Sequence, residues 1–158
     1  MRILGIDPGF ERLGIAILEK SKNNKECVIF SECFKTSARL DFSERLHLIG
    51  GRVREIIKNY KPEVLAIETL FLNTNQKTVM RVAEARGVVM YEGAHAGLKI
   101  FEASPPQIKI ATTGYGRANK EQMIKMVKIL VEIDNSKKSD DELDAIAIAL
   151  TAFAHIRS

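Results

Sequence analysis

The sequence has few of the residues that build disulfide-stapled or zinc-stabilised proteins. It contains two cysteines and three histidines among 158 residues. Cys27 and Cys33 lie six positions apart, with no Cys-x-x-Cys spacing and no histidine close by. If this stretch is a strand, both side chains point to the same face. The pattern indicates free thiols in a reducing compartment rather than a zinc site or a disulfide framework.

Long apolar segments are also missing. No apolar run is long enough to span a bilayer, and the first residues show no charged leader followed by an apolar stretch. No internal repeat, linker or low-complexity tract is visible. We therefore expect a cytoplasmic protein with no membrane partner. A chain of 158 residues that is 46% hydrophobic can bury one core, so we expect a single domain over residues 1–158.

The chain is moderately basic, with a formal net charge of +4 and a pI of about 9.1. This balance favours a polyanionic partner such as nucleic acid. A solvated surface with a modest excess of lysine would give the same balance. The evidence for a function must therefore come from motifs.

Hydrophobic periodicity predicts an α/β domain with a mixed five-stranded sheet flanked by helices. The predicted strands lie at residues 2–7, 13–18, 26–36, 63–68 and 98–101. Helices are predicted at residues 46–60, through 83–94, and after the capping residues Ser104, Asn119 and Ser139. The last helix should run to about residue 155.

Two predicted strands end in an acidic residue, Asp7 in the first and Glu68 in the fourth. If those strands are parallel neighbours, both carboxylates emerge at the sheet edge where open α/β sheets bind ligands. Each residue also has an ordinary explanation, since Asp7 precedes a Pro-Gly turn and Glu68 is a polar strand end. Two acidic strand ends together favour the functional interpretation.

The last helix carries Asp141 and Asp144, which share a face because they lie three residues apart. Asp140 and Glu142 are explained by the positive end of the helix dipole. That explanation fails for Asp144, because an apolar run from residue 145 to 150 follows it and indicates a buried helix. A carboxylate in such a place requires a cation.

Oxygen donors without histidine or cysteine are the ligands of Mg²⁺ or Mn²⁺ rather than zinc. We expect Asp7, Glu68, Asp141 and Asp144 to be the metal ligands and catalytic residues. Two such ions in one site can activate a water and stabilise the leaving oxygen of a phosphodiester. A hydrolytic nuclease therefore needs a carboxylate cluster and no covalent nucleophile.

Four segments of the sequence resemble RuvC-type Holliday junction resolvases of the RNase H-like superfamily. They are Ile3-Leu4-Gly5-Ile6-Asp7-Pro8-Gly9, Ala66-Ile67-Glu68 with Phe71 and Asn73, Ala85-Arg86-Gly87-Val88, and Asp141-Glu142-Leu143-Asp144-Ala145-Ile146-Ala147-Ile148-Ala149. Each motif is weak alone, but four in order over residues 3 to about 154 form a specific pattern.

The resemblance implies an RNase H-like fold and symmetric, Mg²⁺-dependent nicking of four-way DNA junctions by a homodimer, leaving 5′-phosphate and 3′-hydroxyl ends. It also implies two metal ions per active site, with Mn²⁺ able to substitute, and a branch-migration helicase complex as a partner. Asp7, Glu68, Asp141 and Asp144 match the family's catalytic positions. Phe71 matches an aromatic residue that contacts DNA, and Lys109 and Lys120 match basic residues near the scissile phosphate.

Two departures from the family pattern stand out. Phe10 replaces a small polar residue, and Asp140 adds an acid beside Asp141. We expect Asp141 to be the ligand, because Asp140 would lie in the solvated first turn if Ser139 is the N-cap.

Several basic residues flank the predicted loop around residues 114–116 and could contact phosphate, namely Lys109, Arg117 and Lys120. A solvated charged face would explain any one of them, and Phe71 would be core unless its loop is exposed.

Three other functions compete with junction resolution. An ATP-binding fold of the actin and sugar-kinase type shares Asp-x-Gly after a strand, but it needs two lobes, and this chain supplies one. Another RNase H-like nuclease, acting on a different nucleic-acid structure such as an RNA–DNA hybrid, would have a similar metal site. A catalytically inactive DNA-binding module is disfavoured by the complete set of four acids.

Overall fold

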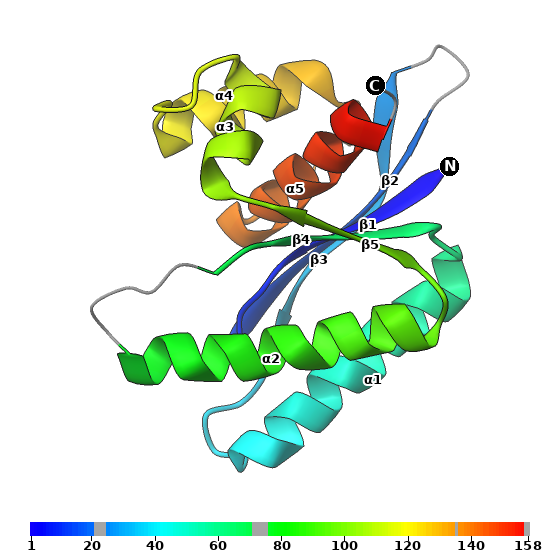
Figure 1. The fold of residues 1–158 in the computed structure, drawn as a ribbon, viewed down its shortest axis with the longest axis vertical. Helices are drawn as coiled ribbons and strands as arrows, with labels where there is room; N and C mark the ends of the chain where they lie inside the picture. The colour runs from blue at the N-terminus through cyan, green and yellow to red at the C-terminus, as the bar shows by residue number, and fades with distance from the viewer. Residues whose placement is uncertain (21–24, 71–75, 135, 157–158) are drawn as a thin grey trace.

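A central β-sheet separates two layers of helices in the computed structural model (Figure 1). The structure describes residues 1–20, 25–70, 76–134 and 136–156. The strands are β1 (Arg2–Asp7), β2 (Arg12–Lys20), β3 (Glu26–Lys35), β4 (Val64–Glu68) and β5 (Lys99–Ala103). The helices are α1 (Phe42–Tyr60), α2 (Gln76–His95), α3 (Pro105–Thr113), α4 (Lys120–Leu130) and α5 (Asp140–Ile156). No helix within the described ranges is long and apolar enough to cross a membrane.

The sheet has five strands in the order β3-β2-β1-β4-β5. The first three form an antiparallel meander, and β4 and β5 add in parallel to β1. The predicted mixed sheet is therefore confirmed. Because β1 and β4 are parallel neighbours, with Ile6 paired to Ile67, their carboxyl ends meet at the same sheet edge.

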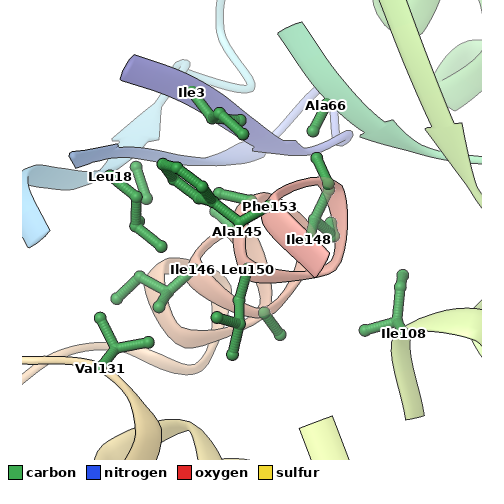
Figure 2. Packing of buried hydrophobic residues seen from close by; sticks show 14 of the residues in the cluster. Ile3, Leu18, Ala66, Ile108, Val131, Ala145, Ile146, Ile148, Leu150 and Phe153 are labelled. Carbon is green, nitrogen blue, oxygen red and sulfur yellow. The ribbon is translucent and has the colours of Figure 1, made fainter. Parts of the chain in front are cut away.

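Both faces of the sheet are buried, each by its own helices. Helices α1 and α2 cover one face, and α5, with α3 and α4 outside it, covers the other (Figure 1). The second core forms around α5, where Ala145, Ile148 and Phe153 pack beneath Ile3 and Ala66 (Figure 2). Burial nearly all round α5 explains its apolar sequence and fixes the helix firmly beneath the strands.

Helix starts follow the predicted caps. Ser104 and Asn119 begin α3 and α4 with reciprocal capping boxes, and Ser139 exchanges the same pair of hydrogen bonds with Glu142 ahead of α5. Helix α1 begins at Phe42, before the periodic stretch from residue 46, because the Asp41 N–H donates to the Glu44 carboxylate at 3.0 Å.

The fifth strand is shifted from its predicted position at residues 98–101. Leu98 belongs to the turn that ends α2, where Gly97 has a φ of +77° and the Leu98 N–H donates to the Gly93 carbonyl. The strand starts one residue later and extends to Ala103. Hydrophobicity alone could not distinguish a helix-ending turn from a strand start.

Candidate active site

Four acidic side chains from three elements lie around one sheet edge. Asp7 ends β1 and Glu68 ends β4, and the pairing of these strands makes the two residues neighbours. Asp141 and Asp144 lie in the first turns of α5. All four are half-buried. The local sequence places each acid at the end of its element, and the strand order brings those ends together.

Close approach of α5 to the sheet depends on glycine in β1 and β2. A Cβ atom on Gly5 would lie 2.2 Å from the Ala145 carbonyl oxygen, and one on Gly14 would lie 2.1 Å from that of Asp141. The Cβ atom added to Gly14 would also lie 3.0 Å from the Asp7 Cβ. The backbone of α5 therefore rests directly on the strands, which places Asp141 beside Asp7.

The site carries an excess of negative charge. Burial, followed by the charges of Asp144, Glu68 and Asp141, raises the pKa of Asp7 from 3.8 to about 7. Burial and the charge of Asp144 also raise the pKa of Glu68. Burial raises the pKa of Asp144, although the ammonium of Lys120 opposes that effect. Carboxylates in this arrangement require a cation for full ionisation at neutral pH.

Two protein cations contact the helix carboxylates. The Lys120 Nζ lies 2.9 Å from Asp144 Oδ2, and the Arg12 guanidinium donates to Asp141 Oδ2 from Nη2 at 2.5 Å and Nε at 2.9 Å. Sequence reasoning had selected Lys120 but missed Arg12. No local signal marks Arg12, since its partner lies 129 residues away in the chain.

The donor set suits a hard divalent cation. Four carboxylates supply only oxygen ligands, and the raised pKa of Asp7 shows that the group lacks compensating positive charge. Among the described residues, no three acidic, histidine or cysteine side chains already converge on one point as a metal cage. Lys120 contacts a carboxylate oxygen of Asp144, and Arg12 contacts one of Asp141. Binding of an ion to those oxygens would require these ion pairs to rearrange.

Asp140 and Asp141 differ clearly in position. The Asp140 side chain is 70% exposed and lies 3.6 Å from Lys120, whereas that of Asp141 is 22% exposed. The charge of Asp141 contributes to the raised pKa of Asp7, whereas the charges of Asp140 and Asp141 both contribute to the raised pKa of Asp144. These observations favour Asp141 as the ligand, and its assignment stays a prediction.

A cleft of about 240 Å³ opens beside Glu68 and Asp144. Lys109 and Lys120 line it, together with an apolar wall that includes Pro105 and Met123. Two of the predicted basic residues therefore face the acidic cluster.

The remaining predicted DNA contacts are Arg117 and Phe71. Arg117 is exposed between α3 and α4, and it is not among the described residues that line the cleft. Phe71 lies outside the described residues, so its predicted DNA contact stays a prediction.

Phe10 packs against a cluster of aromatic and arginine side chains. Its ring meets that of Phe42 edge-on at 5.8 Å, and the guanidiniums of Arg45 and Arg81 lie 5.0 and 5.8 Å from its centre. Arg45 is only 4% exposed. Phe10 thus anchors the turn after Asp7 by packing, where a small polar residue would use hydrogen bonds.

The chain matches known proteins over most of its length. The family model described as crossover junction endodeoxyribonuclease RuvC matches residues 3–152. The curated RuvC of Caldanaerobacter subterraneus is 44% identical over 150 residues, which covers 95% of this chain and 90% of the relative. The RuvC of Alkaliphilus metalliredigens is 45% identical, covering 95% and 91%.

Solved structures agree with this result. The structure described as T. thermophilus RuvC in complex with Holliday junction substrate superposes with a TM-score of 0.89 at 29% identity, covering 99% of this chain and 96% of that one. The yeast mitochondrial Holliday junction resolvase Ydc2 superposes with a TM-score of 0.72 at 16% identity, covering 94% and 76%, which shows a common fold. Sequence and fold therefore lead to one conclusion: the chain belongs to the RuvC family of crossover junction endodeoxyribonucleases and has the RNase H-like fold.

Proposed function

We propose that Asp7, Glu68, Asp141 and Asp144 are the catalytic carboxylates with which this RuvC-family hydrolase resolves Holliday junctions. The observation that carries the assignment is the convergence of the four acids at one sheet edge, where burial and mutual repulsion raise the pKa of Asp7 to about 7. Such a cluster destabilises the fold unless a cation compensates its charge, and clusters of this kind are typical of active sites.

The same four residues would hold two Mg²⁺ ions, for which Mn²⁺ can substitute. When bound, the ions supply an activated water and neutralise charge on the leaving oxygen. Attack of water on phosphorus with cleavage of the P–O3′ bond leaves a 5′-phosphate and a 3′-hydroxyl. The role of the carboxylates is to hold the ions in place, and burial of Asp7 excludes bulk water from one side of the site.

Basic and aromatic residues around the cleft would bind the DNA. Lys120 lies at the start of α4 and contacts Asp144, so its ammonium is positioned to meet charge developing on the scissile phosphate. Lys109, across the same cleft, would anchor an adjacent phosphate. Arg117, outside the cleft, and Phe71, the aromatic expected at the crossover, would make further DNA contacts.

A homodimer and a branch-migration helicase complex are the expected partners. A junction has two symmetric strands to cut, and each chain carries one acidic cluster. Small residues in α2 would let a second copy approach closely. Gly93 packs internally, because an added Cβ would lie 3.0 Å from Leu65 Cδ1. Gly87 has open space around it, so it is the better candidate for contact with a second copy.

A cleavage assay separates this proposal from its nearest alternative. A mobile four-way junction, a linear duplex and an RNA–DNA hybrid are incubated with the protein and Mg²⁺. We expect paired nicks in the junction only. Asp7→Asn should retain junction binding in a gel shift, since basic residues supply phosphate affinity, and should lose cleavage. Cleavage of the hybrid in preference to the junction would indicate another RNase H-like nuclease.

A further inference from the structure

We propose that Arg12 is a positioning residue of the active site that competes with the metal for Asp141 and is released by the DNA substrate. In the free protein its guanidinium holds the carboxylate, and on the junction a backbone phosphate takes the guanidinium instead. The inference rests on the proposed role of Asp141 as a metal ligand, and the experiments below test the two claims separately.

Arg12 and Cys33 both donate to the same oxygen of Asp141. The Arg12 Nη2 and Nε lie 2.5 and 2.9 Å from Oδ2, and the Cys33 Sγ lies 3.5 Å from the same oxygen. The carboxylate is 22% exposed, whereas the arginine is 51% exposed. Asp141 is thus held from the solvent side by a group that can swing away while the carboxylate stays in place.

The fold explains why the two residues meet. Arg12 is the first residue of β2, and Gly14, two residues on, lies against the backbone of Asp141. Arg12 and Gly14 point to the same face of β2. The fit of α5 onto Gly14 therefore sets Arg12 beside the first turn of the helix.

A guanidinium and a divalent cation compete for binding to the same carboxylate. Both bind its lone pairs, and their positive charges repel. Arg12 must therefore lower the affinity of the free protein for metal at Asp141. Phosphate is an alternative partner that matches the paired N–H groups of arginine.

Space for such a partner lies next to Arg12. A hollow of about 300 Å³ is lined by Gly9, Phe10, Glu11, Arg12, Thr78 and Val82, on α2 and the turn after β1. It is separate from the cleft that Lys109 and Lys120 line. A DNA phosphate in this hollow would thus meet Arg12 away from the cleft of Lys120, and its charge would draw the guanidinium off Asp141.

The first experiment measures metal binding without DNA. The full chain is titrated with Mn²⁺, and free Mn²⁺ is counted by electron paramagnetic resonance. Arg12→Ala should bind Mn²⁺ roughly three- to fivefold more tightly than the wild type, as expected for the loss of a partly exposed ion pair. Lys35→Ala is the matched control, because Lys35 is the exposed cross-strand partner of Arg12, and it should leave the affinity within twofold.

Asp141→Asn tests the assumption on which the inference rests. It should weaken Mn²⁺ binding strongly. If it has no effect, Asp141 is not a ligand and the proposed site is wrong there. If it weakens binding while Arg12→Ala equals the wild type, the site stands and the competition by Arg12 is refuted.

The second experiment tests release by DNA. At saturating four-way junction, the Mg²⁺ concentration for half-maximal cleavage should agree within twofold between Arg12→Ala and the wild type, because phosphate has already displaced Arg12 in the wild type. Junction affinity of the variant should fall several-fold, and Arg12→Lys should restore part of it. On the junction, Arg12→Ala could instead need less Mg²⁺ than the wild type, by the same factor as its gain in Mn²⁺ affinity without DNA. That result would show that Arg12 never leaves Asp141.

Discussion

Replacing Asp7 by asparagine should stabilise the metal-free protein above pH 7, although it removes a residue of the proposed active site. Partial burial, followed by the charges of Asp144, Glu68 and Asp141, raises the pKa of the Asp7 carboxylate from 3.8 to about 7. The folded protein thus holds this proton more tightly than the unfolded chain does. The contribution of Asp7 to stability must therefore fall as the pH rises from about 4 to about 7, and this penalty is complete above pH 7.

The size of the penalty follows from the displacement of the pKa. One pK unit corresponds to about 1.4 kcal/mol, so ionised Asp7 costs roughly 4 kcal/mol at pH 8. Asparagine keeps the shape of the side chain and removes the charge. We expect Asp7→Asn to gain about 2–4 kcal/mol at pH 8, which corresponds to a rise in Tm of roughly 5–15 °C for a chain of this size. At pH 3.5 the difference should be small, because the aspartate is then protonated in the folded state and mostly protonated in the unfolded chain.

Urea unfolding with a chelator, at pH 3.5, 6 and 8, measures the effect. Asp140→Asn is the control, because its side chain is 70% exposed and should change stability little at any of these pH values. Added Mg²⁺ should stabilise the wild type far more than Asp7→Asn, since a ligand that binds only the folded state raises its stability. A variant that is less stable than the wild type at pH 8, or equally pH-dependent, would refute the electrostatic reasoning.

Further predictions concern individual residues. Asp141→Asn should be nearly inactive in nicking across a Mg²⁺ titration while Asp140→Asn stays active, and the opposite ranking would move the ligand by one residue. Lys120→Ala should lower the cleavage rate more than junction affinity; equal losses in rate and gel-shift assays would indicate phosphate anchoring alone. Gly14→Ala should lose about 3 kcal/mol in urea unfolding, because its Cβ would lie 2.1 Å from the Asp141 carbonyl oxygen. Gly87→Ala should lose no stability, because the space around Gly87 is open. Equal stability of Gly14→Ala and Gly87→Ala would argue against tight packing of α5. Sedimentation should show a two-fold dimer, whereas a monomer both free and on the junction would contradict it.

The sequence alone determined the elements and the acids that end them. Strand period, helix period and capping residues act over a few positions, so they remain readable without the fold. Asp7 and Glu68 could be recognised because each follows a short apolar run. Asp144 could be recognised because a carboxylate beside the apolar run of α5 has no ordinary structural explanation. Helix and strand ends shifted by a few residues where a turn, such as that at Gly97, takes over an apolar residue.

Only the tertiary structure decided which of these groups meet. The parallel pairing of β1 with β4 makes Asp7 and Glu68 neighbours, and the fit of α5 against Gly14 brings in Asp141. Arg12 joins this group through a partner 129 positions away. No local pattern encodes such contacts, because they depend on where a helix crosses a sheet. The sequence could thus name the acids of the site, whereas the cation that holds one of them became visible only in the fold.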